Sequence, residues 1–179
     1  MENKKIFITG CAKTGTTLVR RLFNAFDELE VYNRDEMSLG TFLKSNYNVA
    51  KRTYNTIFSN KLSPQQEASQ LKTITTSNVF IVNVVRDKSS VLKSDNGYVK
   101  EWRYNASMKQ AQKYQDYIDF TISYEELIKD PNKVQKELSN KLDLKISHDW
   151  SDYPQFMKGI KERAKNSLYS LRPIGAPKK

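Results

Sequence analysis

The stretch Lys5-Ile-Phe-Ile-Thr-Gly-Cys-Ala-Lys-Thr-Gly-Thr-Thr-Leu-Val-Arg20 decides the fold class of this chain. Its apolar start predicts a strand over about 4–9, and apolar residues at helical spacing predict a helix over about 16–26. The loop between them is bounded by Gly10 and Gly15. A strand, a glycine-bounded loop and a helix form a phosphate-binding unit, because N–H groups at the helix start attract an anion. The stretch therefore predicts a P-loop-type α/β fold.

The position of the lysine in this loop separates it from the loops of nucleotide kinases. Kinase loops read G-x-x-x-x-G-K-[ST], with the lysine directly after the second glycine. Here Thr16 occupies that place, and Lys13 stands two residues before Gly15. The displaced cation favours a chemistry other than that of an ATP-dependent kinase.

A second segment predicts another contact at the same edge of the sheet. The β-branched, largely apolar run Val79–Val85 is typical of a buried parallel strand. Arg86 follows it directly, and open α/β sheets bind ligands beyond the carboxyl ends of their strands. Strands that alternate with helices along the chain predict a parallel sheet flanked by helices.

Three segments together resemble the sulfotransferases that use 3′-phosphoadenosine 5′-phosphosulfate (PAPS). Lys13-Thr-Gly-Thr-Thr17 looks like their 5′-phosphosulfate loop, usually K/R-[ST]-G-T-[TS]. Arg86 and Ser94 have the spacing of their 3′-phosphate motif, R-[DN]-P-x-x-x-x-x-S, although Lys88 replaces the proline. Phe120–Pro131 resembles a strand that ends in Y-E-[DE]-L, followed by an Asp-Pro helix start. The resemblance implies a sulfotransferase-like three-layer sandwich.

The resemblance also implies a role for each candidate site residue. It places the cofactor-binding residues at Lys13, Thr14, Gly15, Thr16, Thr17, Arg86, Ser94 and Tyr124. Lys13 would stabilise charge on the leaving phosphate, and Tyr124 would lie against the adenine. Arg86 and Ser94 would bind the 3′-phosphate, for which the planar arginine fork and a hydroxyl donor are suited. PAPS is then the cofactor and 3′-phosphoadenosine 5′-phosphate (PAP) the product, with no metal implied.

The general base, which takes a proton from the acceptor, is predicted at Glu36, with Asp35 as the reserve. Some relatives use a histidine, but His148 lies outside any matching motif and is predicted to be structural or at the surface. Tyrosylprotein sulfotransferases use a glutamate that follows the loop helix, in the region of Asp35 and Glu36. The alternative for both acids is a solvated position at a helix start.

Length and charge set broader expectations. The 179 residues predict one domain over 1–179, with 172–179 as a loop or flexible tail. A net charge of +10 suits an anionic cofactor. The start of the chain has no signal peptide and no apolar run is long enough to span a bilayer, so a cytoplasmic protein without membrane contact is expected.

The rest of the chain is interpreted from periodicity and turn residues. The remaining predicted elements are a short strand near Leu29–Tyr32, mostly helical structure over 37–75 with a break and a Ser63 cap at Ser63-Pro64, a polar turn at Ser94–Gly97, a helix over about 100–116, a strand over about 119–123 and a helix over about 131–142. Trp102, in the helix predicted over about 100–116, is expected to pack in the core.

The sequence therefore predicts a sulfotransferase that moves a sulfuryl group from PAPS to a hydroxyl or amine of a small-molecule or glycan acceptor. Two alternatives stay open. A P-loop nucleotide-dependent kinase would use Asp87 to hold magnesium, although the displaced lysine argues against it. A non-catalytic polyanion-binding module would use the basic charge, with nucleic acid the less favoured partner. Neither the acceptor nor the oligomeric state is specified by the sequence.

Overall fold

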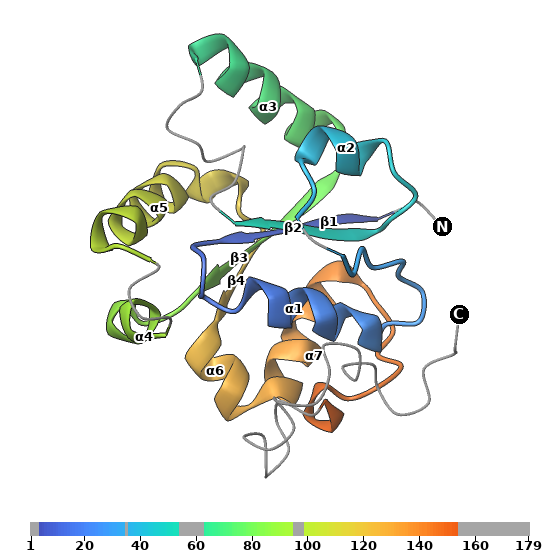
Figure 1. The fold of residues 1–179 in the computed structure, drawn as a ribbon. Helices are drawn as coiled ribbons and strands as arrows, with labels where there is room; N and C mark the ends of the chain where they lie inside the picture. The colour runs from blue at the N-terminus through green and yellow to red at the C-terminus, as the bar shows by residue number, and fades with distance from the viewer. Residues whose placement is uncertain (1–3, 35, 54–62, 95–98, 154–179) are drawn as a thin grey trace.

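Four parallel strands form the centre of the computed structural model, which describes residues 4–34, 36–53, 63–94 and 99–153. The strands are β1 (Lys5–Gly10), β2 (Val49–Thr53), β3 (Val79–Val85) and β4 (Phe120–Ser123). Their order in the sheet is β2-β1-β3-β4 (Figure 1). Because all neighbours are parallel, the carboxyl ends of the four strands meet at one edge.

The register of the strands brings the predicted site segments to that edge. Gly10, the last residue of β1, pairs with Thr53 of β2 and with Val84 of β3. Val85 in turn pairs with Ser123, the last residue of β4. The segments that follow β1, β3 and β4 therefore leave the sheet side by side.

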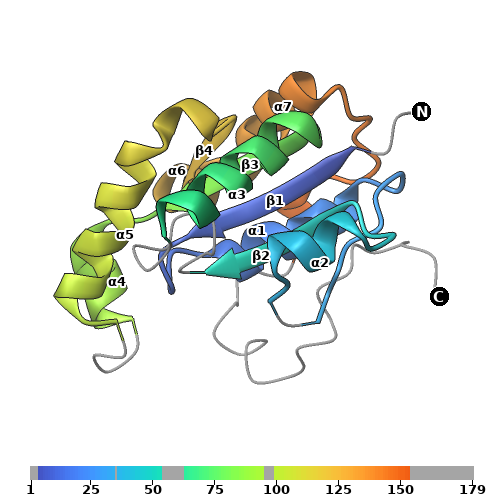
Figure 2. The ribbon, with the colours of Figure 1, turned by 90° about the horizontal axis from the view of Figure 1, so that it is seen from above.

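Helices cover both faces of the sheet, which makes three layers (Figures 1 and 2). The α-helices are α1 (Thr16–Leu22), α2 (Leu39–Leu43), α3 (Pro64–Thr76), α4 (Lys88–Lys93), α5 (Glu101–Lys113), α6 (Tyr124–Lys129) and α7 (Pro131–Leu142). Short 3₁₀ helices are η1 (Phe23–Ala25), η2 (Gln115–Tyr117) and η3 (Trp150–Asp152). Helices α1, α6 and α7 lie on one face, and α2, α3 and α5 on the other. The predicted α/β sheet flanked by helices is confirmed.

Each face of the sheet has its own apolar core, because successive strand residues point to opposite faces. Ile6 and Ile8 pack with the α1 and α7 side and with Trp150. Phe7 points the other way and packs against Phe42 of α2, with the two ring centroids 5.8 Å apart. Burial on both faces explains why β1 is apolar at consecutive positions instead of alternate ones.

Several predicted elements are confirmed. The strand over 79–85 and the helix over about 131–142 match β3 and α7. The Ser63 cap is a full capping box: the Ser63 hydroxyl accepts from the Gln66 N–H at 3.2 Å, and the Gln66 side chain accepts from the Ser63 N–H at 2.9 Å.

Other predictions are wrong in whole or in part. The prediction for 37–75 missed strand β2, which lies between helices α2 and α3. Near Leu29–Tyr32 there is only an isolated bridge from Val31 to Val49. The helix predicted over about 16–26 is an α-helix only to Leu22 and continues to Ala25 as the 3₁₀ helix η1. Trp102 is not in the core, since 65% of it is exposed.

Two predictions fall partly or wholly outside the described residues. The tail over 172–179 lies beyond them, as does most of the turn at 94–97. Within the described parts of the chain, no helix is both long and apolar enough to cross a bilayer.

Candidate functional site at the carboxyl edge of the sheet

The loop after β1 depends on glycine at both of its ends. Gly10 has φ 151° and Gly15 has φ 102°, which are backbone conformations that residues with a Cβ rarely adopt. A Cβ on Gly10 would lie 2.5 Å from the Val84 carbonyl oxygen. Between the glycines, Thr14 closes the loop: its N–H and its hydroxyl both donate to the Cys11 carbonyl, at 3.3 and 2.7 Å. The Thr14 side chain is fully buried, so it shapes the loop from inside.

The start of α1 leaves backbone donors for a ligand. Gly15 is the N-cap of α1, and no side-chain hydrogen bond caps this helix among the described residues. Thr16 is buried and Thr17 half-buried directly behind the loop. Uncapped N–H groups at the first turn of a helix favour an anion.

Lys13 is exposed on this loop. Its φ of 68° lies in the left-handed region, which costs roughly 1–2 kcal/mol for a residue with a Cβ. The surrounding loop therefore imposes this conformation on a lysine, and the cation is carried on a fixed backbone.

Arg86 joins the loop to the end of β4. Its Nη1 donates to the Lys13 carbonyl at 3.2 Å, and its guanidinium carbon lies 4.3 Å from the centroid of the Tyr124 ring. Its own carbonyl accepts from the Tyr104 hydroxyl at 2.9 Å, which fixes the backbone. The Arg86 Nε is buried and has no hydrogen-bond partner among the described residues. A buried donor without a partner is rare in native structures, so this atom sets Arg86 apart from an ordinary surface arginine.

Tyr124 is the first residue of α6, one position after the end of β4. Its ring packs directly over Gly15, where a Cβ would lie 2.6 Å from the ring Cδ2. Gly15, Arg86 and Tyr124 therefore lie together, although they come from three segments that are far apart in the sequence. The structure brings the loop and the segments after β3 and β4 into one cluster.

The close approach of Tyr124 makes a matched pair of glycine substitutions informative. Gly15→Ala should lower the free energy of unfolding by about 1–3 kcal/mol, because the methyl group meets the ring and the backbone is strained. Gly40→Ala should raise it by roughly 0.5–1 kcal/mol, because Gly40 lies in α2 with nothing within 4 Å of the added Cβ. Urea unfolding of the two variants tests this, and equal effects would contradict the packing described for Gly15.

Glu36 lies at the same edge as the loop. Its Oε1 accepts from the Thr53 N–H at 2.9 Å, from the Lys51 ammonium at 3.2 Å and from the Thr53 hydroxyl. Thr53 is the partner of Gly10 in the sheet, so these bonds hold Glu36 beside the start of the loop. All three bonds from described residues end on Oε1, and none of them involves Oε2. The reserve base, Asp35, lies outside the described residues.

Ser94 and Asp87 lie at the two ends of α4, where Asp87 is the N-cap and Ser94 the C-cap. The Ser94 hydroxyl donates to the Val91 carbonyl at 2.8 Å at the end of the helix, and no bond joins it to Arg86 within the described chain. Asp87 is the N-cap: it accepts from the Ser89 hydroxyl at 2.6 Å and from the Ser90 N–H at 2.8 Å. These bonds, the Ser89 hydroxyl first, lower the pKa of Asp87 below its usual value. Its carboxylate is thus used to start a helix.

His148 lies at the opposite edge of the sheet. The Nε2 of its ring is 3.4 Å from Asp27 Oδ1, and its backbone N–H donates to the Ala25 carbonyl at 3.1 Å. Ala25 is the last residue of η1, which follows the end of α1 that lies away from the loop. The contacts agree with the predicted structural role for this histidine.

Two residues of the site were not predicted from the sequence. Tyr104 is buried in α5 and holds the Arg86 carbonyl, and burial raises its pKa. Glu125 accepts from the Asp87 N–H at 3.0 Å and so ties α6 to the segment after β3. Neither lies in a local motif, because their contacts join segments distant in the sequence.

No family model matches the chain. A search of the curated proteins also found no match.

Proposed function

We propose that this chain is a PAPS-dependent sulfotransferase, which moves a sulfuryl group to a hydroxyl or amine. The observation that carries the proposal is the position of Arg86, bonded to the Lys13 carbonyl and stacked on Tyr124. The three segments that resemble family motifs are thereby joined at the edge of the sheet where α/β proteins bind ligands.

The residues of the cluster fit a nucleotide that carries several phosphate groups. The buried Arg86 Nε has no partner among the described residues, and the start of α1 has no side-chain cap there. Both features support binding of anionic oxygens. Because Gly15 has no Cβ, the Tyr124 ring can pack directly over the loop and beside Arg86.

The cluster also suggests how the binding roles are divided. The N–H groups of Thr16 and Thr17 suit the 5′-phosphosulfate, and Arg86 suits the 3′-phosphate. Tyr124 stacks on the Arg86 guanidinium, so it orients this fork in addition to any contact with adenine. Ser94 would have to turn its hydroxyl away from the Val91 carbonyl to reach a phosphate.

When bound, PAPS supplies the sulfuryl group, and PAP is the product. Lys13 carries a positive charge on the loop, where it would stabilise negative charge on a leaving phosphate. Glu36 would accept the proton of the acceptor at Oε2, because its Oε1 already takes three hydrogen bonds. In this scheme Lys13 acts on the leaving phosphate and Glu36 acts on the acceptor.

A label-transfer assay tests the proposal. The chain is incubated with PAPS that carries radiolabelled sulfate, without magnesium, and with a mixture of neutral sugars, phenols, amines and a tyrosine peptide. We expect the label to move from the nucleotide to one of the acceptors. Transfer only from magnesium–ATP labelled at its terminal phosphate would instead indicate a kinase. No transfer from either donor, together with salt-sensitive binding of RNA, would indicate a polyanion-binding module.

A further inference from the structure

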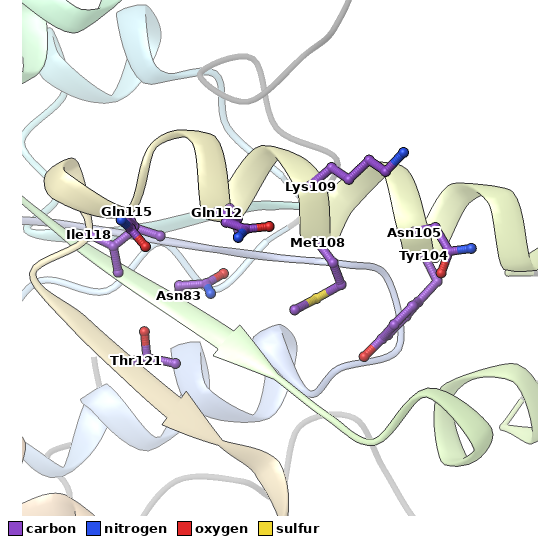
Figure 3. A pocket seen from close by; sticks show the side chains of 10 residues that line it. Asn83, Tyr104, Asn105, Met108, Lys109, Gln112, Gln115, Ile118 and Thr121 are labelled. Atoms are coloured by element: carbon purple, nitrogen blue, oxygen red, sulfur yellow. The ribbon is translucent and has the colours of Figure 1, made fainter.

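We propose that a groove beneath α5 binds a neutral ligand rich in hydroxyl groups, of the sugar or polyol class. The groove has a volume of about 630 Å³ and lies between α5 and the strands β3 and β4 (Figure 3). Its size is within the range of small-molecule sites, roughly 300–1,000 Å³. Its lining includes one buried polar side chain, Asn83.

Asn83 lies in the middle of β3 and is only 6% exposed. The residues on the same face of this strand, Val79 and Ile81, belong to an apolar core. The Asn83 amide points into the groove in Figure 3 and makes no hydrogen bond to any described residue. It is not among the fully enclosed polar atoms, so it reaches the open space of the groove. An amide on this otherwise apolar face gives up the packing of an aliphatic side chain, and its hydrogen bonds are left for whatever occupies the groove.

The other polar groups of the groove are of the same chemical kind. Gln112 of α5, Gln115 of η2 and Thr121 of β4 line it together with Asn83. Amides and hydroxyls both donate and accept hydrogen bonds, as do the hydroxyls of a sugar. Among the described lining residues Lys109 alone is charged, so the groove does not have the several cations expected of an anion site.

Apolar side chains complete the lining. Met108 and Ile118 offer carbon surface between the amides, which suits the C–H face of a sugar ring. Trp102 precedes Asn105 and Lys109 by three and seven residues, so it lies on the same stripe of α5 as these lining residues. It is 65% exposed and is not itself part of the lining.

The groove adjoins the cluster at the edge of the sheet. Tyr104 lines the groove, and its hydroxyl donates to the Arg86 carbonyl. Tyr104 therefore connects the lining of the groove to Arg86. The binding of a neutral sugar follows from the groove alone, whereas its identity as the sulfuryl acceptor rests on the proposed function.

Nuclear magnetic resonance of the ¹⁵N-labelled full chain tests the inference. The probes are the neutral disaccharides maltose, cellobiose and lactose, with sodium sulfate and adenosine as comparison ligands. We expect at least one disaccharide to shift the side-chain amide signals of Asn83 and Gln112. Shifts by sulfate or adenosine alone, or no shift by any disaccharide, would overturn the inference.

The variant Asn83→Leu distinguishes a binding role from a structural one. It should weaken disaccharide binding by roughly tenfold or more, equivalent to about 1.4 kcal/mol. Its thermal midpoint should be no lower than that of the parent, because the change removes an amide without a partner from an apolar face. Gln110→Ala, on α5 but outside the lining, is the matched control and should bind as the parent does. Unchanged disaccharide binding by Asn83→Leu would overturn the proposed site.

A PAP titration of the parent keeps this inference separate from the proposed function. Disaccharide binding without PAP binding would support the groove and contradict the sulfotransferase. PAP binding without disaccharide binding would leave the sulfotransferase supported and overturn the groove as a sugar site.

Discussion

Replacing Lys13 by alanine is expected to lower the rate of sulfuryl transfer by about 10²–10³-fold, because a preorganised charge at the leaving group is lost. The fold should be retained, since Lys13 is exposed and contributes its backbone carbonyl to Arg86. Single-turnover measurement of PAP formation tests the rate, and circular dichroism tests the fold. Lys44→Ala, which removes an exposed lysine at the end of α2, is the matched control and should leave the rate unchanged.

The backbone of Lys13 allows a sharper comparison. A φ of 68° is less strained for glycine than for alanine, so Lys13→Gly should unfold at a higher urea concentration than Lys13→Ala. Both variants should be equally slow in transfer, because both lack the ammonium group. Full activity in either variant would contradict the role given to Lys13.

Replacing Arg86 by alanine is expected to weaken PAP binding by roughly 100-fold, since hydrogen bonds to charged groups contribute about 1.5–3 kcal/mol. Arg86→Lys should recover only part of this affinity, because it keeps the charge and loses the planar fork that stacks on Tyr124. Calorimetric titration of the three proteins gives the affinities. Unchanged binding in Arg86→Ala would contradict the assignment of this residue.

Comparison with adenosine 5′-monophosphate shows which group Arg86 binds, because this ligand is PAP without the 3′-phosphate. If Arg86 binds the 3′-phosphate, Arg86→Ala should weaken PAP binding and leave the monophosphate unaffected. If Arg86 acts by holding the Lys13 carbonyl, both ligands should weaken equally. Equal losses would therefore reassign Arg86 as a positioning residue for the loop.

Elements with a long or continuous apolar pattern could be predicted from the sequence. Strand β3 and helix α7 are of this kind, since the first is apolar at every position except Asn83 and the second has Val134, Leu138 and Leu142 on one face. The β1–loop–α1 unit could be predicted because its glycines mark the loop. These patterns depend on the local sequence alone.

The missed elements depend on contacts that are distant in the sequence. Strand β2 is only five residues long and includes Lys51, which is buried because it pairs with Glu36. Helices α4 and α6 are each six residues long and start at the caps Asp87 and Ser123 instead of showing a periodic pattern. Trp102 lies in α5, which has few apolar residues, so the spacing of those residues could not show which face of the helix packs against the sheet.

The candidate site also contains residues that the sequence could predict and residues that it could not. Lys13, Arg86 and Tyr124 could be predicted because each stands in a local motif that follows a strand. Tyr104 and Asn83 could not, because their roles come from the packing of α5 against the sheet.

The replacement of proline by Lys88 in the segment after Arg86 now has a simple explanation. Lys88 occupies the first position of α4, where proline is also favoured, so either residue fits the same backbone. Ser94 lies at the far end of this helix, so it is separated from Arg86 by the length of α4.

The central claim is tested most directly by calorimetric titration of the chain with PAP, with magnesium–ATP as the comparison ligand. The sulfotransferase account predicts PAP binding of about micromolar affinity or tighter, near −8 kcal/mol, that does not depend on magnesium. Absence of PAP binding, or a preference for magnesium–ATP, would contradict it.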